Sequence, residues 1–276
     1  MIEKTISSYS LLDPENNNGE LIVEVSTKHI ACVLRNNARV EAFELYDLDI
    51  KNEKDFEEAF YEIRTQSELL DKGLKNVKLF YNLSESVIIP ANKFDIKHRG
   101  ELLDMVYGAQ LHSIACHEQF EGDLINIFRV SQFWKDVLNR NFISISEKHL
   151  YTELAERTAA IETFSPHLLH LSFYKEEMIL IAMSKSQLQL VQKFTYKGPA
   201  DPLYHLLNVC RHLNLATELT DLRLCGMIEL ASETYTHIAK YFPGLVLDEM
   251  REDILNTADI QSYPAHYFTP YFSLGV

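Results

Sequence analysis

Short apolar runs divide the first third of the chain into strands and one helix. Runs rich in Val, Ile, Leu and Phe cover residues 21–26, 29–35 and 39–46, and short turns separate them. This spacing predicts two hairpins and therefore three antiparallel strands. Apolar positions at helical spacing follow over residues 56–70, and the alternating segment 76–82 comes directly after them. We expect an amphipathic helix and then a crossover strand.

The same order of elements returns in the second half of the chain. Four strands are predicted there, over residues 168–173, 178–184, 188–196 and 221–226. A helix precedes the last of them, with Asp201 as its expected cap and Pro202 in its first turn. The first helix has comparable signals, since Asn52 is a favoured N-cap residue and Gly73 would follow the last turn.

A constant shift relates the two sets of elements. Moving the sequence by 147 positions places Phe56 on Leu203, and the same shift carries Leu21 onto Leu168. Any two amphipathic helices share an apolar stripe, but here five elements also recur in one order. We therefore interpret the chain as an internal duplication.

Each half then ends with one more helix and one more strand. These are predicted over residues 132–140 and 142–146 in the first half, and over 232–241 and 245–248 in the second. The first half carries an insertion, residues 83–130, with a helix around 101–107 and a strand around 123–128, and a helix over 150–163 joins the halves. We expect two domains, residues 1–149 with this insertion and residues 150–276 with an aromatic tail.

Composition indicates a folded protein and excludes several partners. Hydrophobic residues make up 46% and charged residues 24% of the chain, which are globular values. The 26 Lys and Arg against 40 Asp and Glu give a net charge of −14, which opposes binding to nucleic acid and to anionic membranes. The apolar runs are too short to insert into a bilayer, and the first residues do not form a signal peptide. We expect a cytoplasmic protein.

Glycines and cysteines are too dispersed for most recognisable sites. The two closest of the nine glycines, Gly100 and Gly108, are eight positions apart, so a P-loop, a dinucleotide fingerprint and a nucleophile elbow are all excluded. The four cysteines lack metal-site spacing, and we expect them to be buried and structural. His112 and Cys116 would share a face if they lay on a helix, but a third ligand is missing. The sequence predicts no metal site.

Three antiparallel strands followed by helix, strand, helix and strand, twice over, is the plan of the actin-like ATPase superfamily, whose halves are ribonuclease-H-like. Several stretches also resemble a bacterial domain family of unknown function, namely residues 125–131, residues 143–150 with His149, residues 194–207 and the aromatic C-terminus. The resemblance implies a duplicated ribonuclease-H-like fold with two mixed five-stranded sheets in the order 3-2-1-4-5. It transfers a fold and not an activity. For His149 we expect a structural hydrogen bond at a strand end.

The actin-like resemblance also implies where a nucleotide would sit. Family members hold phosphates at two hairpin turns that contain Asp and Gly. Here the first turn offers Ser26, Thr27 and Lys28 without either residue type, and the second carries Glu176 and Glu177, which would repel phosphate. ATP hydrolysis is therefore not expected. Nuclease chemistry is not expected either, since Glu24 is the one acid on the first strand and the fourth strand has none.

These observations favour a non-catalytic actin-like module that binds a protein partner or a second copy of itself, with no cofactor. The alternative is a nucleotide-binding switch that holds ATP and Mg²⁺ through Ser26, Thr27 and Lys28. The tail is the other candidate site, because it carries five aromatic residues, Tyr263, Tyr267, Phe268, Tyr271 and Phe272. Soluble monomers avoid such an exposed patch, so we expect the tail to pack back across the body of the protein. A partner or a second copy is the other occupant left open.

Overall fold

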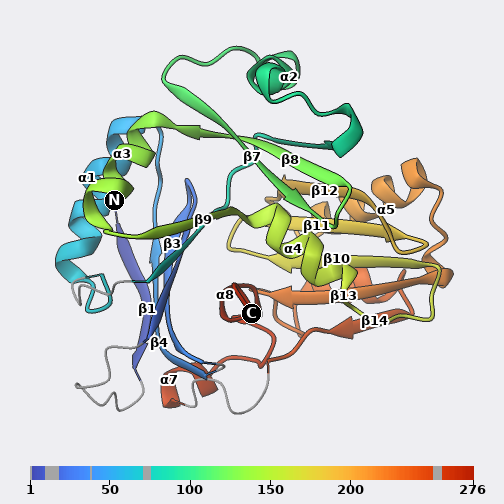
Figure 1. Cartoon of the computed structure of the whole chain (residues 1–276). Helices are drawn as coiled ribbons and strands as arrows, with labels where there is room; N and C mark the ends of the chain where they lie inside the picture. Colours follow the sequence, from blue (N-terminus) through green and yellow to red (C-terminus); the bar gives the residue numbers. More distant parts are fainter. Residues whose placement is uncertain (1, 10–18, 38, 71–75, 251–256) are drawn as a thin grey trace. The chain divides into compact units, whose positions relative to one another are not determined.

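The chain forms two compact units in a computed structural model that describes residues 2–9, 19–37, 39–70, 76–250 and 257–276. Unit 1 comprises Met1–Glu153, Asp253–Ile260 and Gly275–Val276, and unit 2 comprises Leu154–Glu252 and Gln261–Leu274. Figure 1 labels the elements of each unit. Within the described ranges, no helix has the length and apolar character needed to cross a membrane.

The sheet of unit 1 has six strands in the order β1-β4-β3-β2-β5-β9. They are β1 (Glu3–Tyr9), β2 (Glu20–Val25), β3 (His29–Asn36), β4 (Arg39–Asp47), β5 (Val77–Tyr81) and β9 (Ile145–His149). Five of them keep the predicted order 3-2-1-4-5, with β2, β5 and β9 parallel. The sixth, β1, pairs antiparallel with β4 and was not predicted, because its inward positions Ile6 and Ser8 include a hydroxyl. The expectation of five strands was therefore wrong by one edge strand.

Two helices build the core of unit 1 against this sheet. Helix α1 (Glu53–Gln66) begins at the predicted cap Asn52, whose side chain forms a capping box with Asp55. The expected end signal, Gly73, lies outside the described residues. Phe56 of α1 stacks on Trp134 of α3 (Gln132–Asn141), with ring centroids 4.0 Å apart. This contact joins the two helices within one apolar cluster.

The insertion folds as a three-stranded sheet with one α-helix and two short 3-10 helices. Its strands are β6 (Ser86–Pro90), β7 (Ser113–Phe120) and β8 (Leu124–Ser131), in the order β6-β8-β7, and its helices are η1 (Ala91–Lys93), η2 (Ile96–His98) and α2 (Arg99–Tyr107). The predicted helix and the strand at 123–128 are present. The helical alternative for Cys116 was wrong, because this residue lies on β7. Only Phe120 of β7 is buried, so the strand lacks the apolar alternation that would reveal it.

The sheet of unit 2 has the predicted order 3-2-1-4-5, observed as β12-β11-β10-β13-β14. Its strands are β10 (His167–Phe173), β11 (Glu177–Ser184), β12 (Gln187–Thr195), β13 (Thr220–Gly226) and β14 (Gly244–Leu247). The remaining elements of the chain are α4 (Leu150–Ala159), α5 (Asp201–Leu213), η3 (Thr217–Leu219), α6 (Glu233–Ala239), α7 (Ala258–Gln261) and α8 (Thr269–Phe272). The first residues of α4 and most of α7 belong to unit 1. The cap of α5 is Ala200 and not Asp201, because the Asp201 carboxylate accepts the backbone N–H groups of Lys197 and Gly198.

The two faces of the central strand β10 differ in character. Leu169, Leu171 and Phe173 belong to the apolar cluster that includes residues of α5. His170 and Ser172 alternate with them and are also buried. The sheet therefore places polar groups in a dry environment on its second face.

Equivalent strand residues in the two halves are separated by one position more than the predicted shift of 147. Ser26 N–H donates to His29 O in the first hairpin, and Tyr174 N–H donates to Glu177 O in the second. These turn positions make Leu21 equivalent to Leu169 and not to Leu168. A shift of one residue exchanges the two faces of a strand, so this correction decides which residues of the halves are equivalent.

Candidate functional site

The first hairpin turn, where the resemblance implies phosphate, is held by its own serine. Ser26 is fully buried, and its Oγ accepts the N–H groups of Lys28 at 3.0 Å and His29 at 2.8 Å. The same hydroxyl lies 3.0 Å from His29 O and 3.1 Å from His29 Nδ1. Its hydrogen-bonding capacity is therefore used inside the turn.

A buried polar network lies directly behind this turn. Glu24 Oε1 is 2.8 Å from His29 Nε2 and accepts a bond from Asn82 Nδ2 at 2.7 Å. Glu24 and Asn82 are each 1% exposed. The row Ser26, His29, Glu24 has the residue types of a hydrolase triad, but Ser26 Oγ accepts two backbone N–H groups and lacks access to solvent. The network is structural, and we call it the Glu24 network.

The other two residues predicted for phosphate stay at the surface. Thr27 is exposed, and its carbonyl accepts the N–H of Ile50 at 3.0 Å. Lys28 is half-buried, and its Nζ pairs with Asp49 Oδ1 at 3.4 Å. The turn thus brings together one buried hydroxyl, one exposed hydroxyl and one cation that already has an acidic partner.

The second hairpin turn presents one carboxylate and not two. Glu177 is 7% exposed and pairs with Lys193 Nζ at 3.3 Å, so Glu176 is the exposed carboxylate of this turn, next to the exposed Lys175. Tyr196 Oη donates to Tyr174 O at 2.7 Å and closes the turn from the side. Burial, with smaller contributions from Tyr267 and Glu176, raises the pKa of Tyr196 to about 12, so this donor keeps its proton at neutral pH.

Gly226 ends the strand beside this turn and allows two backbones to meet. Its φ is +93°, and a Cβ there would lie 2.1 Å from Phe173 O. Met227 N–H donates to Phe173 O at 3.0 Å across this approach. The one glycine at the position of the superfamily's adenosine-binding pair therefore serves strand packing.

The aromatic tail is largely buried. Phe268, Tyr271 and Phe272 are at most 2% exposed, whereas Tyr263 is 38% exposed and Tyr267 is intermediate. Within unit 2, Tyr271 packs edge-on against Tyr174 with ring centroids 5.7 Å apart. The last two residues belong to unit 1, where Lys78 Nζ donates to Gly275 O at 3.2 Å.

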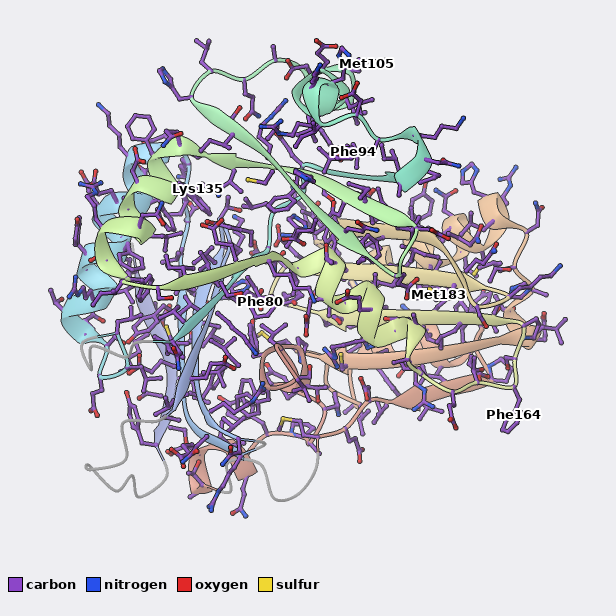
Figure 2. The ribbon with its side chains drawn as sticks, viewed as in Figure 1. Phe80, Phe94, Met105, Lys135, Phe164 and Met183 are labelled. Carbon is purple, nitrogen blue, oxygen red and sulfur yellow. The ribbon has the colours of Figure 1, made fainter. Side chains whose placement is uncertain are left out.

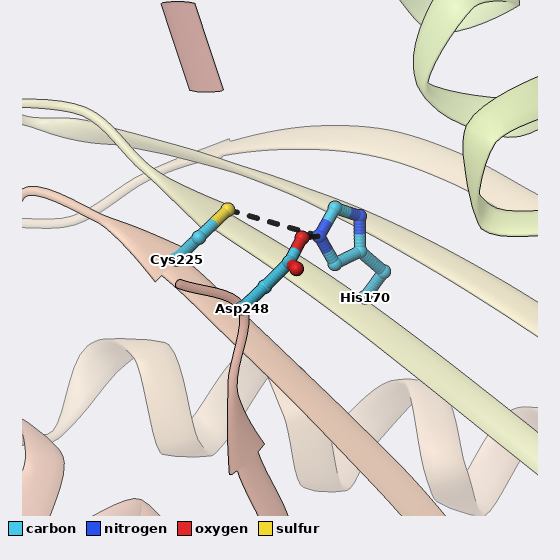
Figure 3. Close-up of side chains that lie close together, drawn as sticks. All are labelled: His170, Cys225 and Asp248. Carbon is cyan, nitrogen blue, oxygen red and sulfur yellow. Dashed lines mark hydrogen bonds and ion pairs between the residues drawn. The ribbon is translucent and has the colours of Figure 1, made fainter. Parts of the chain in front are cut away.

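Figure 3 shows a second polar cluster, within unit 2, formed by His170, Cys225 and Asp248. His170 Nε2 lies 3.7 Å from Cys225 Sγ and 3.4 Å from Asp248 Oδ2. His170 and Cys225 are each 1% exposed, and the Asp248 side chain is 29% exposed. Among the described residues, this is the group of His, Cys and acidic side chains whose ligand atoms all lie within 4.8 Å of one another.

The environment sets the protonation of each group in this cluster. Burial lowers the pKa of His170 and raises the pKa of Cys225 to about 12, so imidazole and thiol are both neutral near pH 7. Burial opposes ionisation of Asp248, but the bond with His170 and the charges of Arg157 and Arg223 hold its pKa below the usual value. The cluster holds one carboxylate, one thiol and one neutral imidazole.

Sequence reasoning missed this cluster because its members are far apart in the chain. His170 lies on β10, Cys225 on β13 and Asp248 just after β14, and only the parallel sheet order brings them together. The available signal was polar residues inside two apolar strands, of which we expected Cys225 to be structural. His149 has the predicted local role, since its Nδ1 accepts the N–H of Tyr151 at 3.1 Å.

Comparison with protein families identifies the chain. Residues 10–245 match the family described as "Protein of unknown function (DUF3822)". The chain therefore belongs to this family, as the resemblance implied. A search of the curated proteins gives no match.

Solved structures establish the fold class. A protein from Bacteroides thetaiotaomicron VPI-5482, described as having an actin-like ATPase fold and unknown function, aligns with a TM-score of 0.74 at 17% identity over 92% of this chain and 98% of its own. A chain of the PilM-PilN type IV pilus biogenesis complex aligns with a TM-score of 0.52 at 11% identity over 92% and 96%. The protein has the actin-like ATPase fold.

Proposed function

We propose that this protein is a non-catalytic actin-like module, formed by internal duplication, that binds a protein partner in the bacterial cytoplasm. The observation that carries the proposal is the closed first turn. The Ser26 hydroxyl accepts backbone N–H groups of its own turn. The buried Glu24 carboxylate behind it is hydrogen-bonded to His29 and Asn82. A phosphate would have to displace these bonds, and no glycine lets it approach the backbone.

Two further observations support a protein partner. A chain with this fold is part of the PilM-PilN complex, so the fold is compatible with assembly on another protein. In this chain, helix α2 of the insertion exposes apolar residues, with Met105 at 82% and Val106 at 60%, and Leu111 just after the helix is 86% exposed. Figure 2 shows Met105 on the outer side of α2. Clustered apolar side chains at a surface are typical of protein interfaces.

Thermal unfolding with and without nucleotide tests the closed turn. We expect no change in Tm at millimolar ATP and Mg²⁺, because the turn offers no site to bind them. A ligand present at about 100 times its Kd would stabilise the protein by about 2.7 kcal/mol. A rise of several degrees that disappears in Ser26→Ala would contradict the proposal.

Paired variants test the α2 surface. Met105→Ser combined with Leu111→Ser should leave Tm unchanged, since both side chains are exposed, and should abolish capture of a co-purifying protein from the native host. The matched control is Ile143→Ser with Phe164→Ser, two side chains that are at least as exposed elsewhere. If both pairs retain the same captured proteins, α2 is not the contact surface.

A second candidate function rests on one atom of the Glu24 network. Oε2 of Glu24 is buried and lacks a hydrogen-bond partner among the described residues, at the strand end where the resemblance expects a metal-positioning carboxylate. This favours a nucleotide-binding switch with ATP and Mg²⁺ at Ser26, Thr27 and Lys28. Replacing all three by Ala should leave cellular function intact under our main proposal. Loss of function in a folded triple variant would favour the switch.

A further inference from the structure

The cluster of His170, Cys225 and Asp248 is the buried group of side chains that the proposed function does not use. Its members come from β10, from β13 and from the residue after β14, all in unit 2 (Figure 3). Three different ligand types, N, S and O, face one another there. Such a set suits a borderline transition metal.

The contacts around His170 direct its Nε2 toward the other two members of the cluster. Thr158 Oγ1 donates to Leu154 O at 2.7 Å and lies 3.3 Å from His170 Nδ1, on the opposite side of the ring. Nε2 lies 3.4 Å from the Asp248 carboxylate oxygen and 3.7 Å from the Cys225 sulfur.

An imidazole nitrogen, a thiolate sulfur and a carboxylate oxygen each bind a divalent metal ion through an electron pair. The ligand atoms of His170, Cys225 and Asp248 all lie within 4.8 Å of one another, so one bound cation can contact all three.

Two of the three distances between the ligand atoms match the edges of a zinc tetrahedron, and the third, between Cys225 and Asp248, is at most 4.8 Å. Zinc lies about 2.3 Å from sulfur and about 2.0 to 2.2 Å from nitrogen and oxygen, so tetrahedral angles put the N and O ligands about 3.4 Å apart and the N and S ligands about 3.6 Å apart. The observed separations are 3.4 Å for His170 and Asp248 and 3.7 Å for His170 and Cys225. His170 Nε2 therefore already stands at the separation from both other groups that a shared metal ion requires.

We propose that His170, Cys225 and Asp248 bind one zinc-class divalent metal ion, with water as the fourth ligand. Binding releases the Cys225 proton to solvent, so thiolate and carboxylate together neutralise the two charges of the ion. This balance makes the site compatible with Arg157, whose Nη2 lies 3.9 Å from Asp248 Oδ2. Ser172 Oγ, 3.5 Å from Sγ, is placed to donate to the thiolate.

The first half of the chain shows that the fold does not require these residues. Strand pairing shows which positions of the two sheets are equivalent. Glu24 pairs with Phe80 as Ser172 pairs with Cys225, and Phe80 in turn pairs with Lys148. The positions of His170, Cys225 and Asp248 are therefore occupied in unit 1 by Ile22, Phe80 and Lys148. Ile22 and Phe80 are buried and apolar. A ligand site in one half is therefore a local property of unit 2, independent of the proposed partner binding.

Metal content of the untagged full chain gives the direct test. Protein purified without chelator should contain about one zinc per chain by inductively coupled plasma mass spectrometry. After removal of zinc, added Co²⁺ should produce a thiolate-to-cobalt charge-transfer band and the visible absorption of tetrahedral cobalt. Absence of zinc together with absence of both cobalt signals would overturn the proposal.

Variants identify the ligands. Cys225→Ser should remove the charge-transfer band and weaken metal binding at least tenfold, whereas Cys210→Ser, a buried cysteine of α5 in the same unit, should change neither. Thr158→Val should keep the band but weaken binding roughly 10- to 100-fold, as expected for a group that orients a histidine ligand. Equal metal binding by Cys225→Ser and wild type would overturn the assignment, and the wild-type measurement stands even where a variant fails to fold.

Discussion

Two buried polar clusters, one in each unit, differ in how closely their atoms approach. In the Glu24 network of unit 1 the side-chain atoms lie 2.7 to 3.1 Å apart, so protons link its members. In the cluster of unit 2, His170 Nε2 stands 3.4 Å from Asp248 and 3.7 Å from Cys225. The residue types are comparable in the two clusters. The spacing separates a network that holds the fold from one that can receive a ligand.

The largest effect on stability is expected from removing the tail, which lies beside the cluster of His170, Cys225 and Asp248. Gly226, the neighbour of Cys225, donates its N–H to His266 O at 2.8 Å, and Phe268, Tyr271 and Phe272 are buried beyond it. Deletion after Gln261 should lower the free energy of unfolding by several kcal/mol, since each buried aromatic contributes about 1.5 to 3 kcal/mol.

Urea unfolding of the truncated and full-length chains measures this loss. If the tail instead serves a partner or a second copy, the truncated protein will unfold at the same urea concentration and lose that partner or its dimer. Tyr263→Ser, at a more exposed aromatic of the same tail, is the matched control and should change stability little.

Much of the fold could be predicted from the sequence because apolar periodicity and turn residues agree there. Strands over 29–35 and 178–184 are nearly continuous apolar runs, and burial of both faces makes them visible. The edge strand β1 and strand β7 escaped because they are half-polar. An edge strand needs little apolar sequence, so periodicity underestimates it.

The stability of the Glu24 network should be sensitive to the loss of a single hydrogen-bond partner. His29→Leu leaves the buried Glu24 carboxyl with one fewer hydrogen bond and should destabilise the protein by about 3 kcal/mol. Thr27→Ala, in the same turn but exposed, should stay within about 0.5 kcal/mol of wild type. The midpoints of chemical unfolding compare the two variants. A His29→Leu protein as stable as Thr27→Ala would show that the network does not hold the turn.

The candidate sites were less predictable than the fold. Ser26 was visible in the sequence as a turn residue, but its burial depends on the backbone N–H groups of Lys28 and His29, which only the folded turn supplies. The cluster of His170, Cys225 and Asp248 depends on strand order, because His170 and Cys225 meet only through the parallel pairing of β10 and β13. Side-chain chemistry at such sites is a consequence of topology and not of local spacing.

In the absence of metal, the cluster of His170, Cys225 and Asp248 should tolerate a substitution better than the Glu24 network does. Cys225→Ala removes one buried atom that makes only long contacts, so metal-free protein should lose about 1 to 1.5 kcal/mol. With saturating Zn²⁺ the gap between wild type and variant should widen, because only wild type gains the binding energy. Differential scanning calorimetry with chelator and with zinc checks this. An identical gap in both conditions would mean that the two clusters do not differ as proposed.

The smallest effect concerns a carboxylate of unit 2 that lies outside both clusters. Asp221 accepts hydroxyl donors from Ser165 at 2.6 Å and Thr163 at 2.5 Å, and these bonds lower its pKa. A lowered pKa in the folded state means that Asp221 stabilises the protein above its usual pKa of about 4, and that this contribution is lost as pH falls through the folded value. Asp221→Asn should therefore cost about 0.5 to 1 kcal/mol at neutral pH, a modest value because the group is partly exposed. The difference from wild type should shrink as pH falls through the lowered pKa of folded Asp221 and disappear below it, where both side chains are neutral. Urea unfolding across this range measures it, with Asp123→Asn at an exposed position as the control for loss of charge. A difference that stays constant from neutral to acid pH would show that the two hydroxyls do not favour the ionised form of Asp221.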